Sequence, residues 1–170
     1  AAHDRLGAAA AHGLLSQALG AQTRHQEAAA EAERAIAIAR GLEEPVWFSW
    51  AIGRLAVERH CLGDLDAARA LFDEVNLIRR RERIDLYLPA SLVGAGAVHL
   101  DLGSPIEAHQ AFVEAYATAS RNGDEWLVFI SLVGLADLAA NLARGNPAAA
   151  SVARLLADAA DARRVRFGYA

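Results

Sequence analysis

Two stretches of the chain, forty residues apart, share one pattern of turn and helix residues. The first spans Gly63–Val75 (GDLDAARALFDEV) and the second spans Gly103–Ala115 (GSPIEAHQAFVEA). Both have a Gly, an Ala five residues later, a Phe four residues beyond that Ala, and a small or β-branched residue three beyond the Phe. A tight turn followed by an amphipathic helix, repeated at a fixed period, is typical of helical solenoids, which usually present a binding surface.

Three further markers recur with nearly the same period. An Ala of the second helix of each hairpin stands at Ala28, Ala68, Ala108 and Ala150. An acidic residue opens the first helix at Asp4, Glu44, Asp85 and Asp124. An aromatic residue follows at Trp47, Tyr87 and Trp126. An ordinary helical bundle would also be amphipathic, but it would not keep turn residues in register.

The sequence therefore predicts an all-α, right-handed α-solenoid of four helical hairpins, with no strands. We expect the hairpins at residues 4–41, 44–83, 85–122 and 124–168, within a single domain of residues 1–170. The chain has no Met, and we expect it to be a fragment of a longer protein.

Composition excludes several classes of function. Hydrophobic residues make up 54% of the chain, yet no run approaches the roughly 18 to 20 apolar residues that span a bilayer, so we expect no membrane contact. With one Cys no disulfide forms within the chain, and a cytoplasmic location is expected. The net charge of −4 disfavours nucleic acid as a partner. All 17 cationic side chains are Arg, which removes phosphate-loop and Schiff-base lysines.

No motif of catalysis or metal binding occurs, so we predict a non-enzyme with no cofactor, no metal and no catalytic residue. His60 and Cys61 are adjacent, but neighbours on a helix point about 100° apart and no third ligand follows at helical spacing. The basic run Arg79–Arg83 could contact an acidic partner or nucleic acid, although it also suits the end of a helix, where cations complement the helix dipole.

The pattern Gly-x-x-x-x-Ala-x-x-x-Phe resembles the second half of a tetratricopeptide (TPR) repeat. Ala56 and Gly96 fall where that motif has a small residue in its first helix. The chain departs from the motif in its period, near 40 residues rather than about 34. It also has Ala32 and Arg154 where the first and fourth repeats should carry the Phe.

Repeats of this longer kind resemble the sensor regions of bacterial LuxR-type and MalT-like transcriptional regulators and related antibiotic-regulatory activators. The segment 142–164 is similar to the closing repeat of such proteins. The resemblance implies a module that receives a peptide, a protein segment or a small-molecule inducer and relays the event to other domains.

Repeat geometry places the binding groove on the first helix of each hairpin. In the second hairpin this predicts Trp50, Arg54, Val57 and His60 as groove residues. The corresponding residues of the third hairpin are Ala90, Val93, Ala97 and Asp101, and those of the fourth are Leu132, Leu135, Ala139 and Leu142. Trp47 and Trp126 are expected in the core, while Trp50 suits either the core or the groove. The alternative function is a freestanding scaffold, or a homodimer formed through the terminal hairpins.

Overall fold

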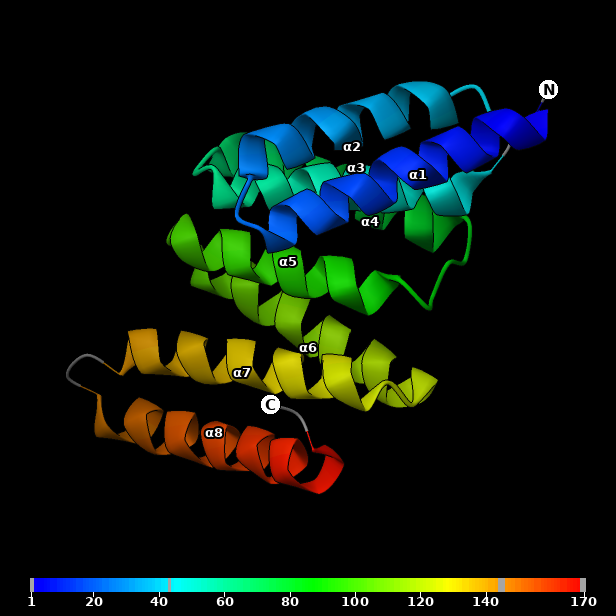
Figure 1. The fold of residues 1–170 in the computed structure, drawn as a ribbon. Coiled ribbons are helices and arrows are strands. Elements are labelled where there is room, and N and C mark those ends of the chain that lie inside the picture. The colour runs from blue at the N-terminus through cyan, green and yellow to red at the C-terminus, as the bar shows by residue number, and fades with distance from the viewer. Residues whose placement is uncertain (1, 43, 144–145, 169–170) are drawn as a thin grey trace. The chain divides into compact units, whose positions relative to one another are not determined.

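The structure is a computed structural model that describes residues 2–42, 44–143 and 146–168 (Figure 1). Within these ranges it has eight helices and no strand, which confirms the predicted all-α class. The helices are α1 (Ala2–Ala21), α2 (His25–Ala39), α3 (Pro45–Cys61), α4 (Leu65–Arg81), α5 (Leu88–Asp101), α6 (Pro105–Asn122), α7 (Glu125–Leu142) and α8 (Pro147–Phe167).

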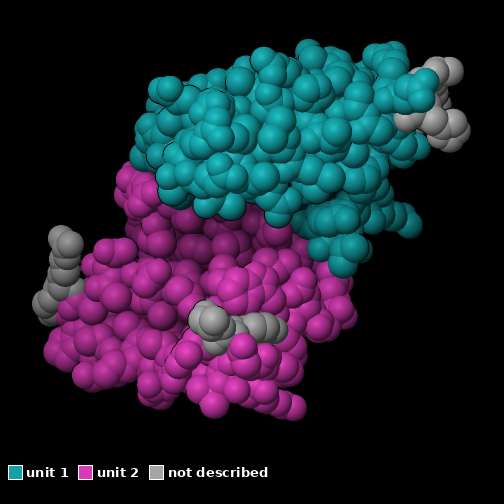
Figure 2. All heavy atoms as spheres, viewed as in Figure 1, with its two compact units in different colours: residues 1–87 teal, residues 88–170 magenta. Residues whose placement is uncertain are grey.

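The chain divides into two compact units, residues 1–87 and 88–170, which Figure 2 shows in teal and magenta. Unit 1 holds the hairpins α1–α2 and α3–α4, and unit 2 holds α5–α6 and α7–α8. In each unit the two hairpins pack in the same way, with the second helix of one against the first helix of the next. The two first helices, α1 and α3 or α5 and α7, also contact each other. The single domain expected from the sequence stays a prediction.

Five of the turns between helices, those after α1, α3, α4, α5 and α6, share one conformation. The backbone is left-handed at Thr23, Gly63, Arg83, Gly103 and Gly123, with φ between 57° and 79°. In each turn the next amide donates a hydrogen bond to the carbonyl five residues before it, for example from Asp64 to Arg59 at 2.9 Å. This Schellman closure satisfies carbonyls that the end of a helix would otherwise leave without a donor.

Helix starts agree with the predicted acidic markers only in part. Asp124 caps α7, since its carboxylate accepts a hydrogen bond from the amide of Leu127 at 3.0 Å. Asp85, in contrast, lies in a turn, and α5 begins three residues later at Leu88. The fourth helix ends at Arg81 rather than at Arg83, because Arg83 adopts the left-handed conformation that ends a helix.

The repeated Ala and Phe positions form the core. Ala28, Ala68 and Ala108 are fully buried, whereas Ala150 in α8 is half-buried. Phe112 of α6 is 2% exposed, and its ring lies over Gly96 of α5 and Gly134 of α7. A Cβ atom at either glycine would overlap the ring. The small residues therefore let one Phe hold its own hairpin and the next one together.

Helix α7 is an exception to the expectation that no segment could span a bilayer. Its 18 residues, Glu125–Leu142, are long and apolar enough to do so by length and composition alone. In unit 2 this helix packs between α6 and α8, where Val128 and Leu132 are buried against Ala119 and Ala160. A core helix has the same length and composition, so this finding is weak evidence for a membrane span.

Candidate partner-binding surface

The predicted groove residues of α3 form one stripe of half-buried side chains. Trp50, Arg54, Val57 and His60 follow one another at spacings of three or four residues, and all four are partly exposed. Residues at this spacing share one face of a helix. We call the surface made by such stripes on the first helices of a unit, α1 and α3 in unit 1 and α5 and α7 in unit 2, the first-helix face of that unit.

Trp50 takes part in packing between the two hairpins of unit 1. Its ring lies against Gly13 of α1, where a Cβ atom would overlap it. It also makes an edge-to-face contact with Trp47, with ring centroids 5.5 Å apart and planes at 88°. The remaining ring surface is open to solvent, so Trp50 combines a core contact with a place on the first-helix face.

Trp126 of α7 was expected in the core, but the structure places it at the surface. It is 46% exposed, and its ring packs beside Phe129 with centroids 5.5 Å apart. The periodicity of the aromatic residues therefore located the repeat correctly but did not predict the burial of this side chain.

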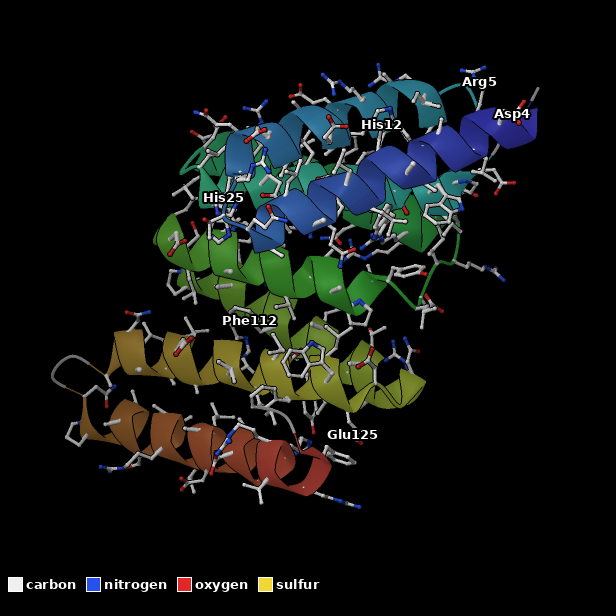
Figure 3. The ribbon with its side chains drawn as sticks, in the orientation of Figure 1. Asp4, Arg5, His12, His25, Phe112 and Glu125 are labelled. Carbon is white, nitrogen blue, oxygen red and sulfur yellow. The ribbon has the colours of Figure 1, made fainter. Side chains whose placement is uncertain are left out.

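Arg54 belongs to a buried ionic cluster beneath the first-helix face. Its Nη2 donates a hydrogen bond to Oε1 of Glu58, which is 1% exposed. The other carboxylate oxygen of Glu58 lies 2.8 Å from Nδ1 of His25, which Figure 3 marks at the start of α2. Gly20 of α1 leaves room for the carboxylate. Arg54 is thus bound internally, and its first role is to neutralise Glu58.

The surroundings of Cys61 do not activate its thiol. Burial raises the pKa of the Cys61 thiol, the carboxylate of Glu58 raises it further, and Arg54 only partly opposes these effects. The thiol therefore stays protonated at neutral pH, whereas a nucleophile or a metal ligand must be a thiolate. Among the described residues no three His, Cys, Asp or Glu side chains gather as a metal site would require.

The predicted groove residues of unit 2 separate into two groups. Ala97 is half-buried and Asp101 is exposed at the end of α5. Val93 is partly buried against two core clusters, and Leu135 of α7 packs beside Phe112 and Leu138. Leu135 thus contacts the core, since the stripe on α7 that continues the forty-residue register runs through Gly134 and Asp137.

The first helices of unit 2 end at a hollow of about 720 Å³. Its polar lining is Asp101 from α5 together with Asp137 and Asn141 from α7. The remaining lining residues are mostly apolar: Leu100, Gly103, Pro105, Leu138, Ala140 and Leu142. An apolar wall with a few polar groups is typical of a ligand-binding cleft. Sequence reasoning named Asp101 and Leu142 but missed Asp137, because it placed the stripe on α7 two residues out of register.

The basic run Arg79–Arg83 is not a uniform cationic surface. Arg79 is 4% exposed and donates hydrogen bonds to the carbonyl oxygens of Tyr87 at 2.6 Å and Ser49 at 3.4 Å. Its guanidinium also lies 5.9 Å from the centroid of the Tyr87 ring. Burial lowers the pKa of Arg79 to about 10, so it remains cationic at neutral pH. This side chain fastens the end of α4 to α3 and to the turn before α5.

Comparison with solved structures places the fold. Aspartyl phosphate phosphatase F from Bacillus subtilis superposes with a TM-score of 0.68 at 15% identity, over 94% of this chain and 50% of the phosphatase. A kinesin light chain with nearly identical TPR-like repeats, from Podosopora anserina, superposes with a TM-score of 0.60 at 15% identity, over 94% of this chain and 96% of the other. The chain thus spans about half the length of the phosphatase.

These likenesses confirm an α-solenoid of TPR-like helical hairpins. No protein-family model matches the chain, and no curated protein sequence is detectably similar to it. The likeness to bacterial transcriptional regulators stays a prediction, and residues 144–145 of the segment that carries it lie outside the described residues.

Proposed function

We propose that the chain is a non-catalytic interaction module that binds a peptide or protein segment on its first-helix face. The observation that carries this proposal is the hollow at the ends of α5 and α7, where Asp101 and Asp137 stand on an apolar wall. Two carboxylates beside leucines suit a segment that combines a basic side chain with apolar ones. A small-molecule inducer with a cationic group is the alternative ligand for this hollow.

The biological setting we propose is a bacterial transcriptional regulator in the cytoplasm. Support comes from the sequence resemblance of segment 142–164 to the closing repeat of such proteins. The native gene would then also encode an ATPase or a DNA-binding domain. A gene product consisting of this solenoid alone would favour the scaffold instead.

The ligand site can be tested by selecting random peptides of about 12 residues on the 170-residue chain and measuring their affinity by fluorescence anisotropy. Asp137→Ala and Asp101→Ala should each weaken the selected basic peptides about tenfold, the loss of one charge-assisted hydrogen bond. Glu107→Ala, an exposed carboxylate on α6, is the matched control and should leave binding unchanged. Equal affinity in all four proteins would show that the peptides bind elsewhere.

Arg54 and Trp50, which the sequence predicted as groove residues, are unsuitable for this test because both also support the fold. Arg54→Ala leaves Glu58 buried without its cation, and Trp50→Ala removes a contact with α1. Both variants should lower stability as well as affinity. Circular dichroism at rising temperature would separate the two effects.

A second candidate function is self-association, and the surface of α1 favours it. No Asp, Glu, Lys or Arg occurs from Leu6 to Thr23, although Leu14 is 57% exposed and Leu15 is exposed beside it. Helix α8 also exposes apolar side chains, Leu155 and Val165 among them, but there they stand beside the exposed charges of Arg154, Asp158 and Asp161. We propose that α1 pairs with α1 of a second copy. Light scattering should then show a dimer that Leu14→Glu converts to a monomer, and a wild-type monomer at high concentration would exclude it.

A further inference from the structure

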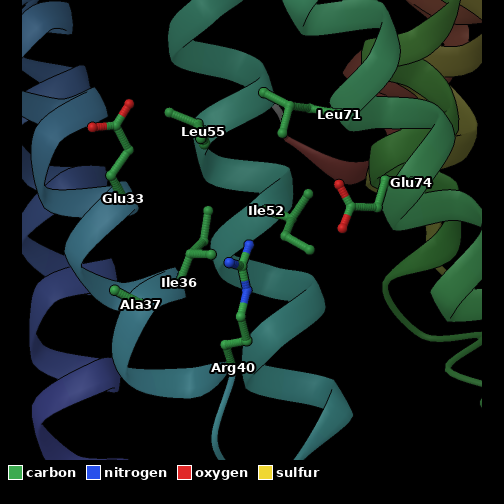
Figure 4. Close-up of a pocket in the computed structure, with 8 residues that line it drawn as sticks. All are labelled: Glu33, Ile36, Ala37, Arg40, Ile52, Leu55, Leu71 and Glu74. Carbon is green, nitrogen blue, oxygen red and sulfur yellow. The ribbon is translucent and has the colours of Figure 1, made fainter.

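The back of unit 1, on the second-helix side, has a groove that the first-helix face does not use. Figure 4 shows its upper part, where α2 and α4 stand on either side of α3. The cavity measures about 290 Å³, and Ile36, Ile52, Leu55 and Leu71 supply its apolar surface. Ile52 and Leu55 are buried and form the floor, whereas Ile36 and Leu71 form half-exposed walls.

A second hollow of about 450 Å³ continues the groove toward the start of α3. The two hollows share Arg40, and the second adds Pro45 and Phe48 from α3 and Ile78 from α4. The α3 residues facing both hollows, Pro45, Phe48, Ile52 and Leu55, stand at spacings of three, four and three residues. This is the spacing of the apolar seam along which one helix packs on another. Ten residues of helix make the groove about 15 Å long.

The rim of the groove is acidic. Glu33 and Glu74 border the first hollow, Glu44 and Glu82 border the second, and Arg40 is the one cationic side chain that lines either. Glu33 is paired with Arg59 at 2.6 Å and Glu82 with Arg81 at 3.4 Å. Within the described residues, Glu44 and Glu74 are exposed and have no ion pair.

From this geometry we propose that the α2–α4 groove is a docking site for a basic amphipathic helix of a partner protein. Its apolar residues would recur at i, i+3, i+7 and i+10 to match the seam of α3. Lys or Arg side chains on its flanks would face Glu44 and Glu74, where their charge is complementary. The site is separate from the first-helix face, so it does not depend on the ligand proposed there.

The occupant is a helix rather than an extended strand because the groove floor is itself helical. An extended segment places side chains on one face every second residue, about 7 Å apart, and has no exposed sheet edge to pair with in this all-α fold. Anionic segments are disfavoured by the rim, since they would bring like charges against Glu44 and Glu74.

The test uses the 170-residue chain and two labelled model peptides of about 14 residues. Both have Leu at positions 1, 4, 8 and 11, and they differ only in carrying Lys or Glu at the flanking positions. Fluorescence anisotropy should show that the Lys peptide binds at least tenfold more tightly than the Glu peptide. The difference should shrink as salt rises, because exposed charges are screened. Equal binding of the two peptides, or no binding of the Lys peptide, would overturn the proposal.

Charge substitutions at the rim of the groove test whether the Lys peptide binds there. Glu74→Lys should weaken the Lys peptide about fivefold to tenfold, while Arg40→Glu should tighten it by a similar factor. Asp73→Lys is the matched control, because Asp73 is the exposed neighbour of Glu74 on α4 and points about 100° away from the groove. Asp137→Ala, on the first-helix face of unit 2, should leave this peptide unaffected. If Asp73→Lys has the same effect as Glu74→Lys, the peptide is responding to overall charge and the proposed site is wrong.

Discussion

The junction between α2 and α3 in unit 1 and the junction between α6 and α7 in unit 2 use the same repeat positions with opposite chemistry. In unit 2, Phe112 lies over Gly134 and packs with Leu138, and the contact is entirely apolar. Eighty residues earlier the same positions hold Ala32, Arg54 and Glu58. There the large side chain comes from the other helix, and an ion pair with His25 nearby replaces the leucine.

The difference shows that the same repeat positions can join two helices through apolar contacts or through an ionic cluster. A Phe over a Gly joins α6 to α7, whereas Glu58 of α3, paired with Arg54, reaches His25 of α2. The ionic version requires that every charge has a partner, since an unpaired buried charge is strongly destabilising. The ionic junction should therefore lose stability when one member of the cluster is removed. The apolar junction should lose stability when the volume of a packed side chain changes.

Among the substitutions at the two junctions, Phe112→Ala should cause the largest loss of stability. The ring is buried at the contact of three helices, so its loss should lower the free energy of unfolding by about 3 to 5 kcal/mol. Chemical denaturation of the purified chain measures it. Phe167→Ala, near the end of α8 and more exposed, should change stability by less than about 1 kcal/mol. Similar values for both would mean that Phe112 does not hold the junction together.

Glu58→Ala tests the ionic junction and should lower stability by about 3 kcal/mol, because Arg54 and His25 lose their common partner. The same denaturation experiment applies. Glu33→Ala provides the control, as the exposed pair of Glu33 with Arg59 should be worth about 0 to 1 kcal/mol. If Glu58→Ala lowers the free energy of unfolding no more than Glu33→Ala does, the buried cluster does not stabilise the junction.

Gly134→Ala adds a single methyl group to the apolar junction and should lower stability by about 1 to 3 kcal/mol, since the new Cβ overlaps Phe112. The sign is informative because Ala normally stabilises a helix relative to Gly by about 1 kcal/mol. Thermal unfolding followed by circular dichroism gives the direction. Combining it with Phe112→Leu should restore part of the loss, and a stabilised single variant would show that the ring moves away freely.

Thr23→Gly should produce the smallest change and raise stability by about 0.5 to 1 kcal/mol. Thr23 ends α1 with φ 61°, a conformation that is unfavourable for a β-branched residue, while Gly103 ends α5, the corresponding helix of unit 2. The gain would appear as a higher midpoint of thermal unfolding. Gln22→Gly, inside the same turn, should not stabilise. An unchanged midpoint for Thr23→Gly would show that the turn is not strained.

The fold was predictable because the repeat uses residue types with strong local preferences, Gly in the turns and Ala where helices pack closely. Gly63 and Gly103 are favoured by left-handed turns, and the fully buried Ala68 and Ala108 leave no room for larger side chains. Thr23 and Arg83 adopt the same turn conformation without the residue type that normally signals it. This is one reason why boundaries near these positions were less accurate than the number of hairpins.

The candidate site was less predictable because it depends on pairs that the repeat does not specify. The spacing did not show that Arg54 pairs with a buried Glu58. It also did not show that Arg79 is buried and donates a hydrogen bond to a backbone carbonyl. In α7 a stripe placed two residues out of register was enough to predict Ala139 where Asp137 stands. Periodicity predicts which helix carries a surface, and the contacts decide which side chains remain available on it.

The twenty-residue interval between left-handed turns has a consequence for how the length of this protein can change. Removing residues 64–103 would join Gly63 to Ser104 and keep a left-handed glycine directly before the residue that precedes the next helix. Removing one residue fewer would place Gly103 directly after Gly63 and lengthen the turn by one residue. Deletions and duplications should therefore be tolerated only in whole hairpins, so that gene segments of about 120 base pairs are the natural unit of change in a chain of this kind.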